Sequence, residues 1–264
     1  MSDNRELFKG TAWYYAKYRL GYSQSFFDHI IKSFDLDKSS RVLDLGTGTG
    51  QIAIPIAAYV KEVVAVDPEE EMLEEGKQQA AQKGITNITW LKSTAEEISS
   101  ELGMFKVTAI GASFHWMKQD DVLEKVYALT EAGGGVVIVA NVSTIINNKG
   151  NDAWKDVVWK TIKEFLGEER RAGNATYQEP KDRFETILSR SKFSRLQTFN
   201  NNYQMPRTID DIIGYLGSTS FASNRLFGNR FEEFKKTLTE RLLKMNPSGD
   251  FLETAVIEAY LAWK

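Results

Sequence analysis

Short apolar segments alternate with amphipathic segments between residues 41 and 141. The apolar segments are rich in β-branched residues, as expected of strands that are covered on both faces, and lie at 42–45, 63–66, 88–91, 107–110 and 136–140. The segments between them have the spacing of helices, at 51–59, 69–83, 95–102 and 120–131. This alternation predicts βαβ units and a parallel sheet with helices on both faces.

Two sequence signals set the limits of the predicted elements. Pro68-Glu69-Glu70-Glu71 is typical of a helix start, because proline is tolerated in the first turn and acidic side chains favour the positive end of the helix dipole. Gly84 suits the end of that helix, and Gly133-Gly134-Gly135 is expected to interrupt the chain before the fifth strand.

The chain outside this region has a different pattern. Residues 8–34 are aromatic-rich, whereas 152–166, 209–216 and 231–245 place apolar side chains at helical spacings of three and four. Further strands are expected at 193–203 and 254–263. The predicted core therefore comprises residues 1–141, 191–204 and 251–264, with 1–34 as an N-terminal helical lid. The segments 142–190 and 205–250 are then helical insertions that form a cap.

Composition removes several kinds of chemistry. The 264 residues include no cysteine and two histidines, His29 and His115, so disulfides, thiolate nucleophiles and a cysteine- or histidine-rich metal site are not expected. The net charge of −3 gives no general reason to bind nucleic acid. The N-terminal sequence is polar, and no segment reaches the roughly 18 apolar residues of a membrane helix. We expect a cytoplasmic protein with no nucleic-acid, membrane or metal partner, and the sequence predicts no particular oligomeric state.

The densest motif is Asp44-Leu45-Gly46-Thr47-Gly48-Thr49-Gly50, which joins the first strand to the next helix. Three alternate glycines let the backbone approach a ligand closely, and the start of the helix offers free N–H groups. Gln51 holds the position of the third glycine in a dinucleotide fingerprint, and no Gly-Lys-Ser/Thr follows as in a P-loop. Asp67 ends the second strand, where a carboxylate can bind both ribose hydroxyls of a nucleotide.

With Gly-x-Gly-x-Gly between two such acids, the sequence resembles class I S-adenosylmethionine-dependent methyltransferases. Two further segments resemble a small-molecule subgroup of methyltransferase type 11 that includes trans-aconitate-type carboxyl methyltransferases. These segments are Gly111-Ala112-Ser113-Phe114-His115-Trp116-Met117 and Ala12-Trp13-Tyr14-Tyr15-Ala16-Lys17-Tyr18-Arg19, the latter followed by Leu20 instead of the usual proline. The resemblance covers residues 8–141. It implies a Rossmann-like, doubly wound α/β sheet of about seven strands, mostly parallel with an antiparallel last strand, and S-adenosyl-L-methionine as the cofactor.

The resemblance also implies which residues bind the cofactor. Asp44 is expected to face the methionine amine, the Ala112 carbonyl to accept from that amine, and Tyr15 or Arg19 to bind the methionine carboxylate. Thr94 holds a position near the adenine where an acid is common in the family. Ser93 or Thr94 could also cap a helix, with Glu96 or Glu97 in its first turn, and this role is compatible with a place near the adenine. The remaining expected cofactor contacts are Gly46, Thr47, Gly48, Gly50, Asp67, Pro68, Ala95 and Glu96.

The resemblance directs His115 and Trp116 toward the methyl group, with Tyr14 and Tyr18 as further substrate contacts. For each of these side chains, packing against the sheet, in a tight turn or beneath the cap is the alternative. Further candidates for the lining of the cap are Trp154, Trp159, Tyr177, Tyr203, Phe221 and Phe227. The candidates for binding an anionic substrate are Arg207, Arg225 and Arg230. For each of them, a solvated surface charge is an equal alternative.

Methyl transfer from a sulfonium is an in-line displacement, so the protein mainly aligns donor and acceptor and excludes water. A carboxylate acceptor needs no base, whereas a hydroxyl acceptor needs one, and His115 is then the candidate for the base or for a hydrogen bond to the acceptor. We predict an enzyme that methylates a small molecule, with O-methylation of a carboxylate or hydroxyl favoured over C-methylation of a quinone-like or polyketide-like ring. The alternatives of other classes are a nicotinamide-dependent oxidoreductase, which the glycine spacing disfavours, and a non-catalytic S-adenosylmethionine-binding protein.

Overall fold

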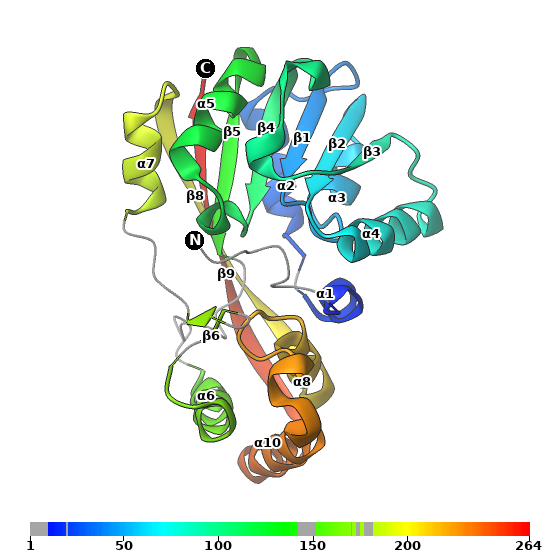
Figure 1. The fold of residues 1–264 in the computed structure, drawn as a ribbon, viewed down its shortest axis with the longest axis vertical. Coiled ribbons are helices and arrows are strands. Elements are labelled where there is room, and N and C mark those ends of the chain that lie inside the picture. Colours follow the sequence, from blue (N-terminus) through cyan, green and yellow to red (C-terminus); the bar gives the residue numbers. More distant parts are fainter. Residues whose placement is uncertain (1–9, 20, 142–151, 170, 173–174, 177–181) are drawn as a thin grey trace. The chain divides into compact units, whose positions relative to one another are not determined.

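The computed structural model describes residues 10–19, 21–141, 152–169, 171–172, 175–176 and 182–264. The chain forms two compact units, each assembled from three separate stretches. The sheet unit comprises Gly21–Val142, Pro180–Asn201 and Ile257–Lys264, and the helical unit comprises Met1–Leu20, Ser143–Glu179 and Asn202–Val256. Figure 1 shows the helices and strands of both.

A seven-stranded sheet runs in the order β3-β2-β1-β4-β5-β9-β8. The first five strands pair in parallel, and β9 pairs antiparallel with β5. The bounds are β1 (Arg41–Leu45), β2 (Glu62–Asp67), β3 (Ile88–Lys92), β4 (Phe105–Gly111), β5 (Thr130–Asn141), β8 (Ser194–Thr208) and β9 (Asp250–Trp263). The predicted Rossmann-like sheet, mostly parallel with an antiparallel last strand, is confirmed.

Helices and 3₁₀ turns connect the strands of the sheet unit. They are α2 (Gln24–Ser33), α3 (Ala53–Ala57), α4 (Glu70–Gln82), η2 (Ala95–Glu97), η3 (Ser100–Leu102), η4 (Phe114–Trp116), α5 (Gln119–Leu129) and α7 (Phe184–Arg190). The helices α4 and α5 lie within two residues of their predicted limits, whereas α3 is shorter than the pattern over 51–59 suggested.

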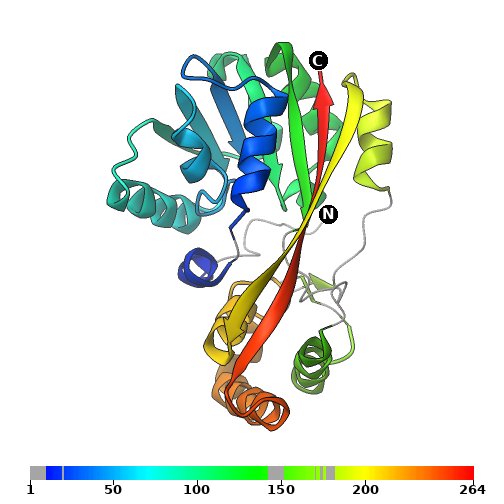
Figure 2. The same ribbon diagram turned by 180° about the vertical axis from the view of Figure 1, so that it is seen from behind.

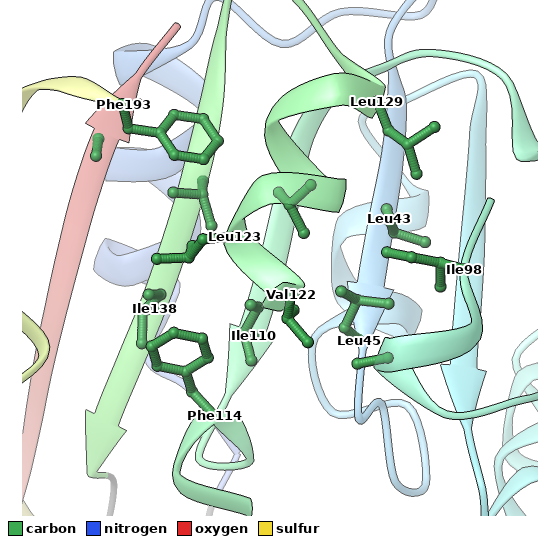
Figure 3. Packing of buried hydrophobic residues seen from close by; sticks show 14 of the residues in the cluster. Leu43, Leu45, Ile98, Ile110, Phe114, Val122, Leu123, Leu129, Ile138 and Phe193 are labelled. Carbon is green, nitrogen blue, oxygen red and sulfur yellow. The ribbon is translucent and has the colours of Figure 1, made fainter. Parts of the chain in front are cut away.

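Helices cover both faces of the sheet, as predicted. On one face, Leu123 of α5 belongs to a buried cluster that also contains Ile110 of β4 and Ile138 of β5 (Figure 3). On the other face lies α2 (Figure 2), which ends at Phe34, and the Phe34 ring stacks on Trp263 of β9 with the ring centroids 4.8 Å apart. Because successive side chains of a strand point to opposite faces, each central strand is covered on both sides.

The helix predicted over 95–102 is wrong. Two single 3₁₀ turns, η2 and η3, occupy this segment, and Ile98 between them is extended, with φ −59° and ψ 144°. Thr94 and Glu97 complete a capping box around η2, so that one turn is satisfied locally. Ile98 is 2% exposed and belongs to the cluster beneath α5 (Figure 3), and burial of this side chain interrupts the helix.

The predicted break at Gly133-Gly134-Gly135 is also wrong, because these glycines lie inside β5. The pairing of β4 with β5 shifts between Phe105, which faces Thr130, and Val107, which faces Gly135, so the extra residues form a bulge. A Cβ on Gly135 would lie 2.2 Å from the Ala262 carbonyl oxygen of β9. Glycine is therefore used here for the close approach of two strands, and the chain passes directly from α5 into β5.

The helical unit contains the amphipathic helices that the sequence predicts. Its elements are α1 (Ala12–Tyr18), α6 (Ala153–Leu166), β6 (Arg171–Ala172), β7 (Ala175–Thr176), α8 (Ile209–Gly217), α9 (Asn224–Phe227), η5 (Gly228–Arg230) and α10 (Phe231–Met245). Val158 and Ile162 of α6 share a buried cluster with Phe234 and Leu238 of α10. The predictions for α6, α8 and α10 are therefore confirmed. Among the described residues, no helix has the length and apolar character needed to cross a membrane.

The two units divide the chain at other places than the predicted core and cap. The segment before residue 21, expected with the core, groups with the helical unit, because the rings of Tyr14 and Tyr18 pack against glycines of α8. Residues 180–190, expected in the cap, group with the sheet unit, because Ile187 and Leu188 of α7 join the cluster beneath α5. Moreover, β8 and β9 each contribute residues to both units.

Candidate cofactor site

The strand order reverses between β1 and β4, since β2 lies beyond β1 and β5 lies beyond β4. In open α/β sheets, ligands bind at such a reversal, beyond the carboxyl ends of the strands. The glycine loop follows β1 at this place, and Ala112 follows β4. Gly46, Gly48 and Gly50 all have positive φ, at 67°, 56° and 84°. The structure thus brings the glycine loop and the segment after β4 to the same edge of the sheet.

Asp44 holds the glycine loop from within. Its side chain is 1% exposed, and its Oδ2 accepts hydrogen bonds from the Thr47 hydroxyl at 2.6 Å and from the Ala53 N–H at 3.0 Å. Burial, opposed by these hydrogen bonds, raises the pKa of Asp44 from 3.8 to about 7. Asp44 therefore joins the end of β1 to the loop and to α3. Its contact with the cofactor amine stays a prediction.

Asp67 holds the same loop from the end of β2. Its Oδ2 accepts from the Gly48 N–H at 2.8 Å, and its Oδ1 accepts from the Glu69 N–H at 2.9 Å. Burial raises the pKa of Asp67. A carboxylate oxygen accepts two hydrogen bonds, so Asp67 can hold the loop and still accept from ribose hydroxyls. Pro68, predicted beside it, is exposed.

The segment after β4 packs directly against the glycine loop. The Ser113 hydroxyl donates to the Leu45 carbonyl oxygen at 3.0 Å, and a Cβ on Gly46 would lie 2.5 Å from Ser113 Oγ. Only glycine allows this approach. Ala112 has φ 52°, a left-handed conformation that is uncommon outside glycine, and its N–H donates to the Val139 carbonyl oxygen at 3.0 Å. A strained residue that its neighbours hold in place is typical of a functional site.

The residues after β3 cap a 3₁₀ turn and connect it to the segment that follows β4. Thr94 N–H donates to Glu97 Oε2 at 3.2 Å within the capping box, so the predicted cap is confirmed, and Ala95 is buried. Glu96 Oε1 accepts from the Lys118 N–H at 2.8 Å. Glu96 thus ties the turn after β3 to the end of the segment that follows β4. The adenine contacts of this turn stay a prediction.

His115 and Trp116 lie in η4, immediately after the Ala112 turn. Phe114 precedes them and is 0% exposed in the cluster beneath α5 (Figure 3), which anchors the turn. The rings of His115 and Trp116 are half-buried, with their centroids 4.5 Å apart. The structure therefore places both predicted residues at the edge where the glycine loop lies. Their contacts with a substrate stay a prediction.

The predicted tyrosines of the N-terminal segment pack within the helical unit. The Tyr14 hydroxyl accepts from Asn224 Nδ2 at 2.8 Å, and the Tyr18 ring fills the space beside Gly214, where a Cβ would lie 2.3 Å from it. Both side chains therefore pack within the helical unit, which is the alternative that the sequence left open beside substrate contact. Their roles as substrate contacts stay predictions.

Arg19 is held in the helical unit by Ser218 and two tyrosine rings. Its Nε donates to Ser218 Oγ at 2.9 Å and its Nη2 to the Ser218 carbonyl oxygen at 3.2 Å. The guanidinium carbon lies 4.8 Å from the Tyr15 ring centre and 4.9 Å from that of Tyr215. Tyr15 and Arg19 thus lie together in the helical unit, and the binding of the methionine carboxylate by either of them stays a prediction.

Two of the predicted cap residues line a cavity. The rings of Trp159 and Phe221 stack with their centroids 5.2 Å apart and border a cavity of about 70 Å³ in the helical unit. Trp154 and Phe227 are instead core residues, each 5% exposed. Tyr203 of β8 is half-buried, and Tyr177 lies outside the described residues.

The three predicted cap arginines differ in their surroundings. Arg207 is 5% exposed, and its Nε pairs with Glu253 Oε2 at 2.8 Å, so its charge is balanced inside the helical unit. Arg225 and Arg230 are exposed, and Arg230 Nε pairs with Glu233 Oε2 at 3.5 Å.

Sequence reasoning missed three residues that touch the site. Trp90 of β3 packs at Gly50, where a Cβ would lie 2.7 Å from the Trp90 ring, and Met117 Cε lies 3.3 Å from the Cβ position of Gly46. Tyr22 places its hydroxyl 2.5 Å from the Cβ position of Gly111, the last residue of β4. Met117 ends the segment that resembles the small-molecule subgroup, whereas no local motif marks Trp90 or Tyr22, because each reaches the site from a distant part of the sequence.

The donor and acceptor groups at this edge suit S-adenosylmethionine. The loop glycines have the left-handed backbone of the Gly-x-Gly-x-Gly pattern, Asp67 at the end of β2 suits ribose hydroxyls, and the Ala112 turn lies beside the loop. Gln51, in place of the third glycine of the dinucleotide fingerprint, disfavours a dinucleotide. The site therefore fits a cofactor with a nucleoside and an amino-acid end.

Comparisons with known proteins agree with this interpretation. A family model described as a methyltransferase domain matches residues 42–134. An uncharacterised methyltransferase-like protein of Schizosaccharomyces pombe is 28% identical over 152 residues, which are 53% of this chain and 57% of that protein. A putative methyltransferase of Dictyostelium discoideum is 27% identical over 230 residues, which are 85% of this chain and 81% of that protein. The chain thus spans little more than half of the first relative.

Solved structures share the fold. A putative type II methyltransferase of Anaeromyxobacter dehalogenans is 17% identical and superposes with a TM-score of 0.60 over 93% of this chain and 97% of that chain. The phosphoethanolamine N-methyltransferase 2 of Haemonchus contortus, solved with phosphomonomethylethanolamine and S-adenosylhomocysteine, is 15% identical, with a TM-score of 0.55 over 99% of this chain and 57% of that chain. The resemblance to the trans-aconitate-type subgroup stays a prediction. The loop, the acids that hold it, the sheet order and these matches together identify residues 42–134 as a methyltransferase domain of class I, the class that uses S-adenosyl-L-methionine.

Proposed function

We propose that this chain transfers the methyl group of S-adenosylmethionine to an oxygen atom of a small molecule, either a carboxylate or a hydroxyl. The junction of the glycine loop with the Ala112 turn, at the reversal of strand order, carries the proposal. Next to this junction in the sequence, η4 places the rings of His115 and Trp116 side by side. When bound, the cofactor supplies a methyl group on a positively charged sulfur, which is already activated for displacement.

The residues of the chain then have to orient two reactants and exclude water. Asp44 and Asp67 fix the backbone of the glycine loop through the Thr47 hydroxyl and the Gly48 N–H. Ser113 ties the turn after β4 to the end of β1. Such fixed positions are what an alignment mechanism needs, since orientation alone supplies roughly 7–11 kcal/mol of a barrier. No metal or cysteine nucleophile is required for this step.

Several observations favour a small acceptor. The net charge of −3 disfavours a nucleic acid. The segment after β4 also differs from the Asn/Asp-Pro-Pro-Tyr/Phe motif of methyltransferases that act on nucleic-acid amino groups. The Haemonchus structural neighbour, whose fold this chain shares, was solved in complex with a small phosphorylated amine.

His115 distinguishes the two kinds of oxygen acceptor. If the acceptor is a hydroxyl, His115 takes its proton, and turnover depends on the ionisation of this histidine. If it is a carboxylate, no proton is taken, and His115 only donates a hydrogen bond. We expect His115→Ala to lower kcat/KM in both cases, by about 10²–10⁴-fold for a base. His115→Gln restores most of the rate only in the carboxylate case.

The experiment is a turnover assay with S-adenosylmethionine and a panel of small acids, alcohols, phenols and quinone-like rings, with mass-spectrometric analysis of the product. Methyl esters or ethers are the expected products, and a new carbon–methyl bond would favour the C-methyltransferase alternative. Full turnover and unchanged acceptor affinity in both His115 variants would contradict both roles of this residue. Tight cofactor binding with no product from the whole panel would favour a non-catalytic binding protein.

A further inference from the structure

Tyr22 lies at the cofactor edge of the sheet, although no motif of the sequence includes it. We propose that the Tyr22 hydroxyl binds the amino-acid end of the cofactor, and that Tyr22 is therefore a positioning residue for the methyl donor. The inference rests on the assignment of S-adenosylmethionine to this edge. It adds a polar contact that the glycine loop and the two acids do not supply.

The Tyr22 ring is fixed by the start of α2. Ser23 caps this helix, since its side chain accepts from the Phe26 N–H. The Tyr22 ring stacks on Phe26 with the centroids 4.8 Å apart and meets Phe27 edge-on at 6.3 Å. A residue before the cap that packs on the fourth helical residue fixes the path of the incoming chain, and Tyr22 and Phe27 stand in this relation. The ring is therefore held without any ligand.

The hydroxyl at the end of this fixed ring reaches the reversal of strand order. It lies 2.5 Å from the Cβ position of Gly111, and Ile52 Cδ1, at the far end of the glycine loop, lies 2.8 Å from the same position. Gly111 is the last residue of β4, and Ala112 follows it with its left-handed backbone. The Tyr22 hydroxyl thus lies between the glycine loop and the Ala112 turn. The side chain is half-buried, so one part of it is accessible.

The amino-acid end of the cofactor needs polar partners at this place. Asp44, the family's expected partner for the amine, is 1% exposed, and its Oδ2 already accepts from Thr47 and Ala53. A buried carboxyl so engaged serves mainly to hold the loop. A phenol hydroxyl both donates and accepts, so Tyr22 can bind the carboxylate or the amine of an amino acid. Tyr22 and the Ala112 carbonyl are then two groups of the sheet unit that can bind this end.

The test compares two ligands that differ in this end alone. S-adenosylhomocysteine carries the amino acid, and 5′-methylthioadenosine lacks it while retaining the nucleoside and the thioether. Titration calorimetry of wild type and Tyr22→Phe with both ligands measures the contact, because phenylalanine keeps the ring packing on Phe26 and removes only the hydroxyl. We expect the Kd of S-adenosylhomocysteine to rise about 10–150-fold, as for loss of a hydrogen bond to a charged group. The Kd of 5′-methylthioadenosine should stay unchanged.

A matched control is Tyr59→Phe. Tyr59 is 38% exposed, and its hydroxyl accepts from Gln24 Nε2 at 3.2 Å, so its removal should leave both affinities unchanged. Equal binding of S-adenosylhomocysteine by wild type and Tyr22→Phe would overturn the inference, and so would an equal loss for both ligands, which would indicate a structural role only. If wild type itself does not bind S-adenosylhomocysteine, the cofactor assignment fails instead, so the two failures are distinguishable.

Discussion

At the scale of single residues, Gly46 shows how tightly the site is built. It turns the chain out of β1 with φ 67°, and a Cβ at this position would lie 2.5 Å from Ser113 Oγ. A left-handed conformation costs a non-glycine residue about 1–2 kcal/mol, and overpacking costs about 1–3 kcal/mol more. We predict that Gly46→Ala lowers the free energy of unfolding by both amounts and weakens S-adenosylhomocysteine binding at least tenfold.

Gly84→Ala is the matched control for this prediction. Gly84 has the same φ of 67°, but a Cβ there meets nothing within 4 Å. Gly84→Ala should therefore lower the free energy of unfolding only by the cost of the left-handed backbone, about 1–2 kcal/mol in denaturant unfolding. It should leave the Kd of S-adenosylhomocysteine unchanged. Equal effects of the two substitutions on stability and binding would show that the contact between Gly46 and Ser113 does not matter.

Asp44 predicts a particular dependence of stability on pH. Burial raises its pKa from 3.8 to about 7, so the folded protein holds this proton more tightly than the unfolded chain does. The contribution of this group to stability is therefore complete below pH 4 and is lost as the pH rises through 7. The full loss amounts to about 4 kcal/mol, since one unit of pKa corresponds to about 1.4 kcal/mol.

The variant Asp44→Asn removes the titration and keeps an oxygen that accepts from Thr47 and Ala53. Relative to this variant, the free energy of unfolding of wild type should fall between pH 4 and pH 8, as measured by denaturant unfolding at each pH. Parallel curves for the two proteins over this range would contradict the role given to the Asp44 carboxyl.

At the scale of elements, the pattern of apolar residues predicted the strands and helices whose limits depend on neighbouring residues in the sequence. The strands β1 to β4 and the helices α4, α6 and α10 follow apolar spacing and clear starts, and they lie close to their predicted limits. The segment 95–102 does not, because burial of Ile98 outweighs the helical spacing around it. The bulge at Gly135 depends on the approach of β9, more than 120 residues later, which no local pattern contains.

A buried ion pair joins β8 to β9 in the helical unit. Arg207 and Glu253 are 5% and 0% exposed, and Arg207 Nη1 also donates to the Tyr18 carbonyl oxygen at 3.1 Å. Removing one partner leaves the other charge buried and unpaired, which costs about 3–5 kcal/mol. We predict this loss in the free energy of unfolding for Arg207→Leu, whereas the double variant with Glu253→Leu should recover much of it.

Denaturant unfolding of the two variants and wild type measures this coupling. Lys235→Gln is the control, because Lys235 pairs with Glu232 at 3.3 Å on the surface and such pairs contribute little. If Arg207→Leu were no more costly than Lys235→Gln, the pair would not be the buried link between these strands.

At the scale of the whole molecule, the sequence predicted the cofactor better than the shape of the site. The glycine loop, Asp67 and the Ala112 turn lie at the carboxyl ends of three neighbouring parallel strands, β1, β2 and β4, so the sheet brings them to one edge. Tyr22 and Trp90 reach this edge by packing from elsewhere, and their place follows only from the folded chain. The N-terminal residues Tyr14 to Arg19 belong to the helical unit for the same reason, since their partners on and after α8 lie some 200 residues later.

The central claim is that the edge of the sheet at β1 and β4 binds S-adenosylmethionine. Titration calorimetry of the full chain with S-adenosylhomocysteine and, separately, with NAD tests it most directly, with Gly46→Ala as the variant that alters the loop. We predict one S-adenosylhomocysteine per chain, weakened at least tenfold in Gly46→Ala, and no heat of binding with NAD. Binding of NAD without S-adenosylhomocysteine, or S-adenosylhomocysteine binding that Gly46→Ala leaves unchanged, would contradict the account.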